Sequence, residues 1–220
     1  MTKRTLILLS GGLDSAANLA LAMNDPEVTV VQTLTLDYGQ KALACELRAA
    51  QALSKHYGVR HEMLSAVWLS RFSKSALNHP DSKVPSMQSQ DLDNLAATTQ
   101  SASAVWVPNR NGLFIEMAAV VAESREIGQI LVGFNREEAA TFPDNSADYL
   151  AAISKALSYS TAGRVAVDSY TIKMNKKEIV TQLRALKSPF PFELIWSCYQ
   201  AGHKPCGECE SCKRLKRALE

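Results

Sequence analysis

Residues 6–15 join an apolar run to a polar, glycine-rich turn of the kind that binds phosphate. Leu6–Leu9 is typical of a buried strand, Ser10-Gly11-Gly12-Leu13-Asp14-Ser15 follows it directly, and residues 16–22 are typical of a helix. Glycines let the backbone approach an anion closely, and free N–H groups at a helix start point at it along the favourable end of the helix dipole. The order of strand, glycine turn and helix therefore predicts a phosphate site.

This turn differs from two better-known phosphate loops. It lacks the Gly-Lys-Ser/Thr of a Walker loop and the Gly-x-Gly-x-x-Gly spacing of a dinucleotide fold. Ser-Gly-Gly-Leu-Asp-Ser instead resembles the PP-loop of ATP pyrophosphatases, which cut ATP between the α and β phosphates and adenylate a substrate oxygen. An ordinary strand-to-helix turn is the alternative, but six matching residues directly after an N-terminal strand favour the PP-loop.

Four cysteines near the C-terminus have the spacing of a metal site. Cys198 is followed by Cys206, Cys209 and Cys212, so two Cys-x2-Cys steps share one cysteine. Zn²⁺ takes four ligands tetrahedrally and four thiolates leave no open position, so we expect one structural zinc ion per chain. An iron–sulfur cluster is the rival occupant. The basic residues that we expect to offset part of the thiolate charge are Lys204, Lys213 and Arg214.

The composition is that of one reduced domain with a small appendage. A chain of 220 residues with 46% hydrophobic content can bury one full core. The net charge of +2 is too small to indicate a nucleic-acid or membrane partner, and no apolar run approaches the ~20 residues of a spanning helix. Five cysteines, an odd number, and the lack of a signal-peptide pattern favour a cytoplasmic protein over a secreted disulfide framework.

Strands and helices alternate along most of the chain, which predicts an α/β fold with an open, doubly wound and mainly parallel sheet. Strands are expected at 6–9, 28–36, 59–64, 129–134 and 165–170, and helices at 16–22, 42–57, 113–127, 147–157 and 176–186. Ligands of such sheets lie beyond the carboxyl ends of the strands, so residues 10–15 and 37–40 are expected at one edge. We expect residues 1–190 to form this domain and residues 191–220 the zinc-binding appendage.

Residues 65–103 break this pattern. Ser, Asn, Asp, Gln and Pro dominate the stretch, and Pro80 and Pro85 disfavour a regular element. A loop of this length inside a compact domain is functional or mobile, so we predict an active-site lid or an interface segment, with a disordered insertion as the alternative.

Further motifs occur in the order found in one family of PP-loop enzymes. They are Asp37-Tyr38-Gly39-Gln40-Lys41 with Glu46, Val107-Pro108-Asn109-Arg110-Asn111, Phe142-Pro143-Asp144, Lys176, and Trp196-Ser197-Cys198-Tyr199 with the trailing cysteines. Together with the PP-loop they resemble the 7-cyano-7-deazaguanine synthases (QueC) of the queuosine and deazapurine pathway. The resemblance covers nearly the whole chain and leaves residues 65–103 unmarked.

The resemblance implies a ligase with an adenine nucleotide α-hydrolase-like fold that acts on 7-carboxy-7-deazaguanine and ammonia. ATP, with Mg²⁺, would adenylate the carboxylate, and ammonia would displace AMP to give an amide. A second ATP would activate the amide oxygen, so that loss of AMP leaves the nitrile. The resemblance also implies a homodimer, and we expect no direct contact with nucleic acid.

The PP-loop donors are expected to hold the pyrophosphate leaving group. Asp14 is an acceptor and is assigned to Mg²⁺ or to helix capping, whereas Arg110 and Lys176 are expected to neutralise phosphate charge. The residues expected in catalysis are Ser10, Asp14, Ser15, Arg110 and Lys176. Those expected to contact ATP are Leu8, Leu9, Ser10, Gly11, Gly12, Leu13, Asp14, Ser15, Leu34, Thr35 and Asp37.

A guanine-like edge needs an acceptor for its ring N–H and exocyclic amine, which a carboxylate provides. Asp144 is the first choice and Glu137 and Glu138 come next, although Asp144 lies two residues before a helix and can instead cap it. The residues expected to bind this substrate are Tyr38, Gln40, Asn109, Arg110, Glu137, Glu138, Phe142 and Asp144.

The loop 138–145 departs from the family's Asp-Tyr-Ser-Gly-Tyr-Pro-Asp-Cys pattern and keeps only Pro143 and Asp144 of it. Glu138 replaces Asp, Phe142 replaces the second Tyr, and Ala139 and Ala140 replace the hydroxyl-bearing Tyr and Ser. This change leaves open an enzyme that stops at the amide, or one that couples the activated carboxylate to an amine of a protein or tRNA. A PP-loop tRNA-thiolation enzyme is a second alternative, but Cys45, expected inside a helix, has no evident activating partner. A zinc-stabilised binding module would leave the PP-loop and Arg110 unexplained.

Overall fold

The computed structural model describes residues 2–220 and is built around a five-stranded parallel sheet. The strands β1 (Lys3–Leu8), β2 (Val28–Asp37), β3 (Arg60–Ser65), β4 (Gln129–Leu131) and β5 (Ala166–Asp168) lie in the order β3-β2-β1-β4-β5. The chain adds strands first on one side of β1 and then on the other, so β1 lies at the switch point where doubly wound sheets bind ligands. The predicted α/β fold is confirmed.

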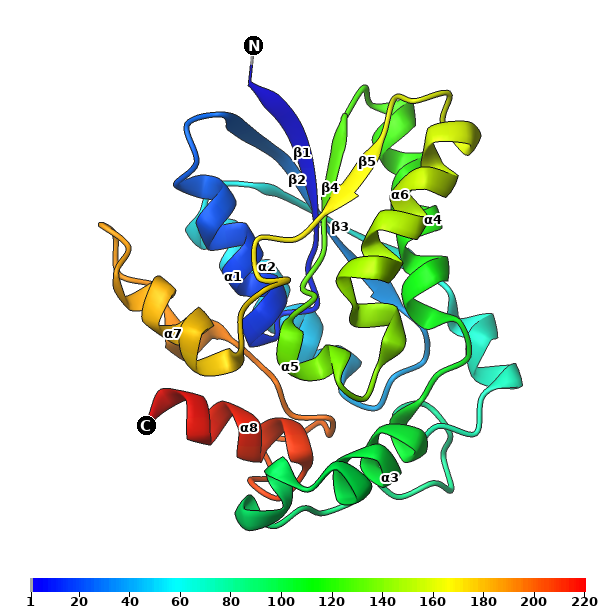
Figure 1. The fold of residues 1–220 in the computed structure, drawn as a ribbon, viewed down its shortest axis with the longest axis vertical. Coiled ribbons are helices and arrows are strands. Elements are labelled where there is room, and N and C mark those ends of the chain that lie inside the picture. The colour runs from blue at the N-terminus through cyan, green and yellow to red at the C-terminus, as the bar shows by residue number, and fades with distance from the viewer. Residues whose placement is uncertain (1) are drawn as a thin grey trace.

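Helices cover both faces of the sheet (Figure 1). The helices α1 (Leu13–Met23), α2 (Leu43–His56) and α7 (Lys176–Arg184) lie on one face, and α4 (Arg110–Ser124) and α6 (Ala147–Ser160) lie on the other. Successive side chains of a strand point to opposite faces. Leu6 therefore joins the core under α4 and α6, while Ile7 joins the core under α1 and α2, and both are fully buried.

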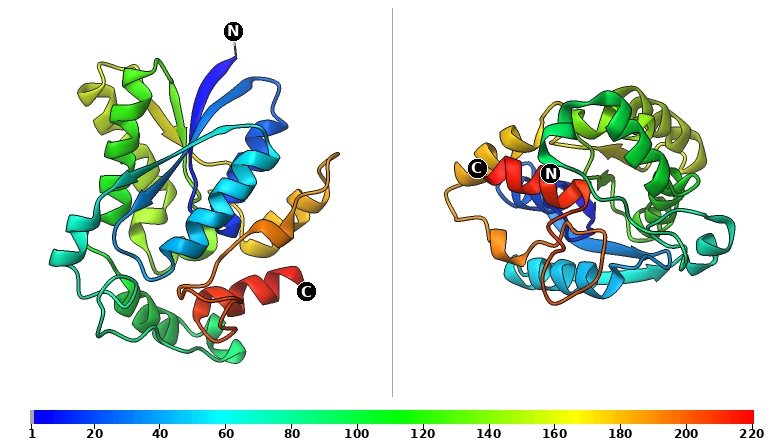
Figure 2. Two further views of the ribbon diagram at one scale, coloured as in Figure 1. Left: turned by 180° about the vertical axis from the view of Figure 1, so that it is seen from behind. Right: turned by 90° about the horizontal axis from the view of Figure 1, so that it is seen from below.

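A further group of elements lies across the end of the sheet at which the strands finish (Figure 2). It contains the helices α3 (Leu95–Val105), α5 (Arg136–Ala139) and α8 (Glu210–Leu219), with 3₁₀ turns at Val67–Phe72, Ser89–Asp93, Pro143–Asn145 and Phe192–Leu194. The segment before α3 lies beside α8, where Met87 N donates to Glu208 O at 2.9 Å. Two segments far apart in the sequence thus meet below the sheet.

Residues 65–103 are more regular than predicted. The helix α3 begins inside this stretch, and Ala76, Leu77 and Leu92 are buried. Asn94 caps α3, its side chain accepting hydrogen bonds from the first N–H groups of the helix at 3.0 and 3.2 Å. No helix was predicted here because the sequence of α3 contains several Ser and Thr residues and lacks a clear apolar stripe.

Several element boundaries also differ from the predictions. The helix α4 begins three residues earlier than expected, at Arg110, because Asn109 takes a left-handed conformation that starts it. Residues 135–145, where no helix or strand was predicted, contain α5 and a 3₁₀ turn, and α8 was not predicted. The strands β4 and β5 are only three residues long, shorter than the predicted 129–134 and 165–170.

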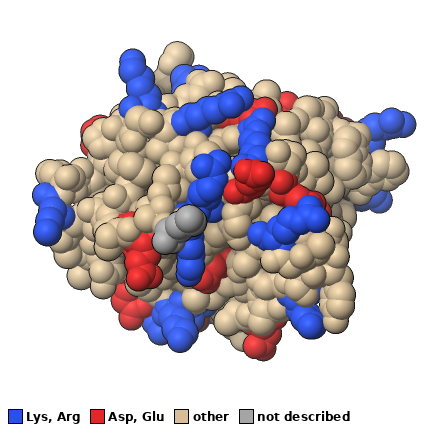
Figure 3. Space-filling view, turned by 90° about the horizontal axis from the view of Figure 1, so that it is seen from above, with Lys and Arg blue, Asp and Glu red and all other residues tan. Residues whose placement is uncertain are grey.

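The opposite end of the molecule, where the strands begin, carries charges of both signs (Figure 3). Arg125 lies 2.7 Å from Glu62 and also donates to Gln32, and basic and acidic side chains are interspersed over this face. Such a mixture gives this face no extended field of one sign. No helix within residues 2–220 is long and apolar enough to cross a membrane.

Asn18 is a buried polar link between α1 and the segment that follows β5. Its amide donates to Asp14 O at 2.9 Å and to Thr171 Oγ1 at 2.8 Å, and its carbonyl accepts from Tyr170 N at 2.8 Å. The side chain is fully buried. These bonds connect α1 to the segment that follows β5, the strand at one edge of the sheet.

Replacing Asn18 with alanine is expected to lower the free energy of unfolding by about 2–4 kcal/mol, because buried N–H and hydroxyl groups lose their partners. Urea unfolding measures the change. The exposed Gln51 on α2 supplies the control, since Gln51→Ala should change stability by less than about 0.5 kcal/mol. Equal stability of the two variants would contradict the role given to Asn18.

Candidate active site

The glycine turn lies at the start of α1 and is held by its own serines. Ser10 N donates to Ser15 Oγ at 3.2 Å, and Gly12 N donates to Ser10 Oγ at 3.3 Å. Gly11 has φ +83°, and a Cβ there would lie 2.8 Å from Glu46 O, so the turn requires glycine. The first N–H groups of a helix lack carbonyl partners within it, which favours an anion at this point.

The stretch Trp196–Tyr199 closes one side of the turn. Trp196 N donates to Gly11 O at 2.8 Å, and Leu13 N donates to Ser197 Oγ at 3.3 Å. The turn is therefore built from residues near both ends of the chain.

A cavity of about 240 Å³ opens at this turn, beyond the carboxyl ends of β1, β2 and β4. The predicted site residues that line it are Leu8, Leu9, Ser10, Gly12, Leu13, Asp14, Ser15, Leu34, Thr35, Tyr38, Gln40, Arg110, Glu138, Phe142 and Lys176. Those outside its lining are Gly11, Asp37, Asn109, Glu137 and Asp144. Asp37 Oδ1 instead accepts a hydrogen bond from Gly39 N at 2.9 Å.

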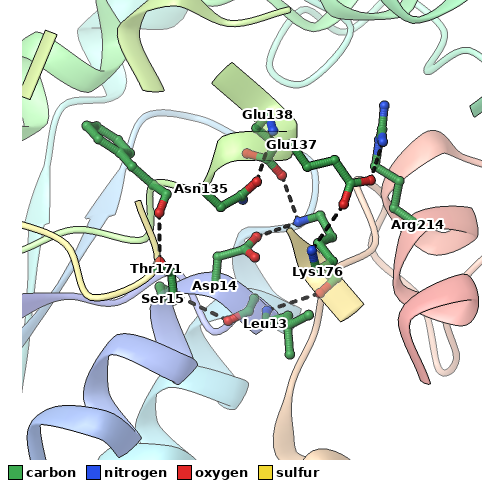
Figure 4. A network of polar contacts seen from close by, with 12 residues as sticks. Leu13, Asp14, Ser15, Asn135, Glu137, Glu138, Thr171, Lys176 and Arg214 are labelled. Atoms are coloured by element: carbon green, nitrogen blue, oxygen red, sulfur yellow. Dashed lines mark hydrogen bonds and ion pairs between the residues drawn. The ribbon is translucent and has the colours of Figure 1, made fainter. Parts of the chain in front are cut away.

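Lys176 lies between two carboxylates at the wall of this cavity (Figure 4). Its Nζ is 2.5 Å from Asp14 Oδ2 and 2.8 Å from Glu138 Oε1, and its side chain is 6% exposed. Burial alone would lower the pKa of Lys176, but the charges of Asp14 and Glu138 raise it above its usual value. Burial raises the pKa of Asp14 to about 6, against the opposing effect of the Lys176 ammonium.

Helix caps fix the backbone at both ends of this interaction. Asn175 and Glu178 form a capping box before Lys176: Asn175 Oδ1 accepts from Glu178 N at 2.9 Å, and Asn175 N donates to Glu178 Oε2 at 2.7 Å. Asn135 caps α5 by accepting from Glu138 N at 2.9 Å. The ammonium and its partner Glu138 are thus set by local sequence signals.

Asp14 does not cap α1, so that predicted alternative is wrong. Gly12 is the N-cap residue, and no side-chain hydrogen bond caps the helix there. Asp14 Oδ1 is buried and has no hydrogen-bond partner among residues 2–220. An unpaired carboxylate oxygen beside a phosphate turn is a suitable ligand for Mg²⁺.

Glu137 faces α8 instead of the cavity. Its Oε1 accepts from Arg214 and lies 2.9 Å from Arg217 Nη2, and its Oε2 accepts from Lys176 N at 3.1 Å. Arg214 also lies 2.8 Å from Glu210. The expectation that Arg214 offsets thiolate charge is therefore wrong, because its buried guanidinium is committed to two carboxylates.

Several residues that line the cavity were not among the predicted site residues. They are Glu46, Asn111, Trp196, Ser197 and Tyr199. Most of them stand inside the family motifs, and Glu46 lies in the first turn of the helix that follows Asp37–Gln40. Its position at the carboxyl edge of the sheet was the sequence feature that could have identified Glu46 as a site residue.

Arg110 lies over the ring of Tyr38 at the cavity wall. Arg110 Cζ lies 5.8 Å from the centroid of the Tyr38 ring, and burial raises the pKa of Tyr38 to about 12.

Part of the altered loop lines the cavity. Glu138, Phe142 and Asn145 belong to the lining, whereas Ala139, Ala140 and Thr141 do not. Phe142 stands where the family pattern has Tyr, so one hydroxyl of that pattern is missing from the cavity wall. Ser146 caps α6 by accepting from Tyr149 N at 3.1 Å, so Asp144 is not the cap. Asp144 is half-buried, and burial raises its pKa while Arg110 opposes the rise.

The four C-terminal cysteines converge as predicted. The sulfur atoms of Cys198, Cys206, Cys209 and Cys212 all lie within 4.8 Å of one another, and those of Cys206 and Cys212 are 3.9 Å apart. Four thiolates about 2.3 Å from a tetrahedral Zn²⁺ are about 3.8 Å apart. Backbone N–H groups point at the sulfurs, for example Cys206 N at 3.4 Å from Cys198 Sγ. This group is suited to a metal ion.

Cys45 lies apart from this group, on α2. Its Sγ is 3.1 Å from Arg48 Nη2 and 3.5 Å from Gly202 N. We expected no activating partner for Cys45, and the structure places the Arg48 guanidinium beside its sulfur. No cysteine is among the described residues that line the cavity.

Comparisons with known proteins agree with these features. Residues 4–220 match the family model described as queuosine biosynthesis protein QueC. The chain is 47% identical over 217 residues to the 7-cyano-7-deazaguanine synthase of Pelotomaculum thermopropionicum, covering 99% of this chain and 96% of that relative. It is 45% identical over 215 residues to that of Desulforamulus reducens, covering 98% and 92%.

Among solved structures, the U34-tRNA thiolase NcsA from Methanococcus maripaludis with its [4Fe-4S] cluster matches with a TM-score of 0.48 and 15% identity. The match covers 87% of this chain and 61% of that one. A likeness this distant says nothing about the metal or the substrate of this chain.

The PP-loop leaves no room for a side chain at Gly133, just after β4. A Cβ there would lie 2.6 Å from Ser15 N and 2.9 Å from Ser15 Cα. Gly133→Ala is therefore expected to displace the start of α1 and to weaken ATP binding about 10-fold or more, measured by calorimetry. Gly128→Ala is the control, because the nearest atom to a Cβ there is 3.7 Å away. Unchanged ATP affinity in Gly133→Ala would contradict this placement of the nucleotide.

Proposed function

The chain belongs to the QueC family of queuosine biosynthesis proteins, and on this basis we propose that it is an ATP-dependent 7-cyano-7-deazaguanine synthase, a ligase that acts on 7-carboxy-7-deazaguanine and ammonia. The main support for this proposal is that the PP-loop, Arg110 and Lys176 all line one cavity. The chain also matches the family model over residues 4–220. Relatives named for this product cover almost the whole chain.

The proposed reaction uses ATP twice. The carboxylate oxygen attacks the α phosphorus of ATP and releases pyrophosphate, and ammonia then displaces AMP to leave the amide and a proton. The amide oxygen attacks a second ATP in the same way. Loss of AMP and of the two amide protons leaves the nitrile.

We assign the leaving pyrophosphate to the PP-loop, where Ser10 and Ser15 and the N–H groups at the start of α1 supply donors. Asp14 would hold Mg²⁺, which when bound neutralises phosphate charge. Lys176 and Arg110 would stabilise charge that develops on the phosphates. Adenine is assigned to the end of β2, at Leu34 and Thr35.

The nitrile is a better proposal than the two alternatives that were left open. Relatives that cover almost the whole chain are named for the nitrile product, and two of the three residues that replace the family's hydroxyls, Ala139 and Ala140, do not line the cavity. Sulfur transfer would need a reactive cysteine at the nucleotide, and the cysteine closest in sequence to the PP-loop, Cys45, is outside the lining.

We further propose one structural zinc ion per chain on the four cysteines, supported by the distances between their sulfurs. We also propose a division into residues 1–190 and a zinc-binding segment 191–220, a cytoplasmic location and a homodimer. Exposed aromatic side chains near the end of β3, Trp68 and Phe72 at 50% and 70% exposure, offer a surface for such a dimer.

The decisive assay incubates the protein with ATP, Mg²⁺, ammonium and 7-carboxy-7-deazaguanine. Mass spectrometry is expected to find the nitrile with two AMP formed per product. Lys176→Met should lose about 100-fold or more of AMP formation, because two carboxylates are left without their cation, whereas the exposed Lys177→Met should not. Amide without nitrile would refute the synthase, and ADP in place of AMP would refute the PP-loop chemistry.

Metal analysis of the purified protein is expected to find one zinc per chain in a colourless preparation. Removing the metal should lower the melting temperature by about 10 °C or more, because the thiolates then repel and the segment that contacts Gly11 loosens. Cys206→Ser should lose the zinc, and the matched control Cys45→Ser should keep it. A brown, iron-bearing protein would contradict the assignment.

A further inference from the structure

Resting on the proposed function, we propose that Glu46 determines the substrate specificity of this site, its carboxylate accepting hydrogen bonds from the ring N–H and the exocyclic amine of a guanine-like substrate. This assignment differs from that of the family motifs, which point first to Asp144. Glu46 is favoured by its place in the cavity wall and by the partners that the other carboxylates already have.

The carboxylates around the cavity are mostly committed to cations. Asp14 and Glu138 share the ammonium of Lys176 at 2.5 and 2.8 Å. Glu137 binds Arg214 and Arg217 on the side away from the cavity. Each of these carboxylates already has charged donors, so a neutral ring would have to compete with a cation for it.

Glu46 has no such partner. It lies in the first turn of α2 and lines the cavity, and no Lys, Arg or His nitrogen among the described residues lies within ion-pair distance of its carboxylate. Its Oε2 accepts one hydrogen bond, from Gln40 Nε2 at 3.0 Å. The side chain is partly exposed and lines the cavity, and burial raises its pKa, with Gln40 and Arg110 opposing the rise.

Gln40 holds the Glu46 carboxylate in one orientation. The Gln40 amide is itself fixed at both ends, since its Oε1 accepts from Tyr38 N at 2.9 Å and its Nε2 also donates to Leu36 O at 3.0 Å. Gln40 is buried. The carboxylate is therefore preorganised before a ligand arrives, as a specificity-determining acceptor must be.

The unmet hydrogen-bonding capacity of Glu46 defines the chemistry of its ligand. An ionised carboxylate only accepts hydrogen bonds, and its two oxygens match two adjacent N–H donors. A guanine-like ring presents this pair on one edge, the ring N–H and the amine. A ring that lacks the amine leaves a carboxylate oxygen unpaired, and a site built for a donor rejects such analogues strongly.

Arg110 supplies the complementary charge in the same cavity. It lines the wall, lies over the Tyr38 ring and forms no ion pair with a described carboxylate. A cation and an anion that line one cavity without an ion-pair partner fit a ligand that carries hydrogen-bond donors at one end and negative charge at the other. The substrate of the proposed function has both.

Asp144 is less well placed for the same task. It is not part of the cavity lining, whereas its neighbours Phe142 and Asn145 are. Its carboxylate lies 3.5 Å from Asn145 Nδ2, and the charge of Arg110 acts on it. Asp144 is therefore the rival acceptor in the test.

The test compares two substrates, 7-carboxy-7-deazaguanine and its analogue without the exocyclic amine, in the zinc-loaded wild type and in Glu46→Gln. The wild type should discriminate against the analogue. Glu46→Gln should raise the KM for the full substrate by about 10- to 100-fold and lose most of that discrimination, because a charged acceptor is replaced by an amide. The KM for ATP should change by less than about 3-fold.

Two further variants decide the outcome. Glu116→Gln, an exposed carboxylate on α4, is the matched control and should behave as the wild type. If Asp144→Asn abolishes discrimination while Glu46→Gln keeps it, the acceptor is Asp144 and this inference is wrong. If the wild type forms no AMP from the full substrate, the proposed function fails and this inference fails with it.

A complex of the wild type with the substrate provides a second measurement, which does not depend on the folding of a variant. Ring N–H and amine nitrogens within about 3.2 Å of the Glu46 oxygens would support the inference. A ring edge bound elsewhere would overturn it.

Discussion

The ammonium of Lys176, buried between Asp14 and Glu138, is the contact on which the arrangement of the site depends. The three side chains come from α7, α1 and α5, so one cation fixes three elements at one spacing (Figure 4). Removing a partner from a buried ion pair typically costs about 3–5 kcal/mol, since a charge is left uncompensated. Glu137 and Arg214 extend the same network to α8, so the cysteine segment and the PP-loop share one electrostatic framework.

The segment 191–220 contributes to the nucleotide site, through contacts with the PP-loop backbone and through one arginine. Its cysteines hold the turn that begins at Trp196–Tyr199, and this stretch contacts the PP-loop through Gly11 and Leu13. Its helix carries Arg214 to the carboxylate beside Glu138. A metal bound by the cysteines would therefore affect the site through the position of Trp196–Tyr199, because no cysteine among the described residues lines the cavity.

The sheet and its main helices could be predicted from the sequence because their apolar residues recur with the periods of strands and helices. The helix α3 could not, because its Ser- and Thr-rich sequence resembles a loop and its start depends on one capping residue, Asn94. Within the site, the PP-loop and the cysteines were predictable from local spacing. The pairing of Lys176 with Asp14, and the lack of an ion-pair partner at Glu46, were not predictable, because they depend on how residues far apart in the chain come together.

The hydrogen bonds from Trp196 N to Gly11 O and from Leu13 N to Ser197 Oγ have a consequence for biosynthesis. The PP-loop leaves the ribosome long before the residues that close it, because Trp196 and Ser197 follow it after the whole of the sheet. A nascent chain therefore carries an open phosphate turn while the four strands after β1 are being made. A product terminated before Trp196 lacks both of these hydrogen bonds.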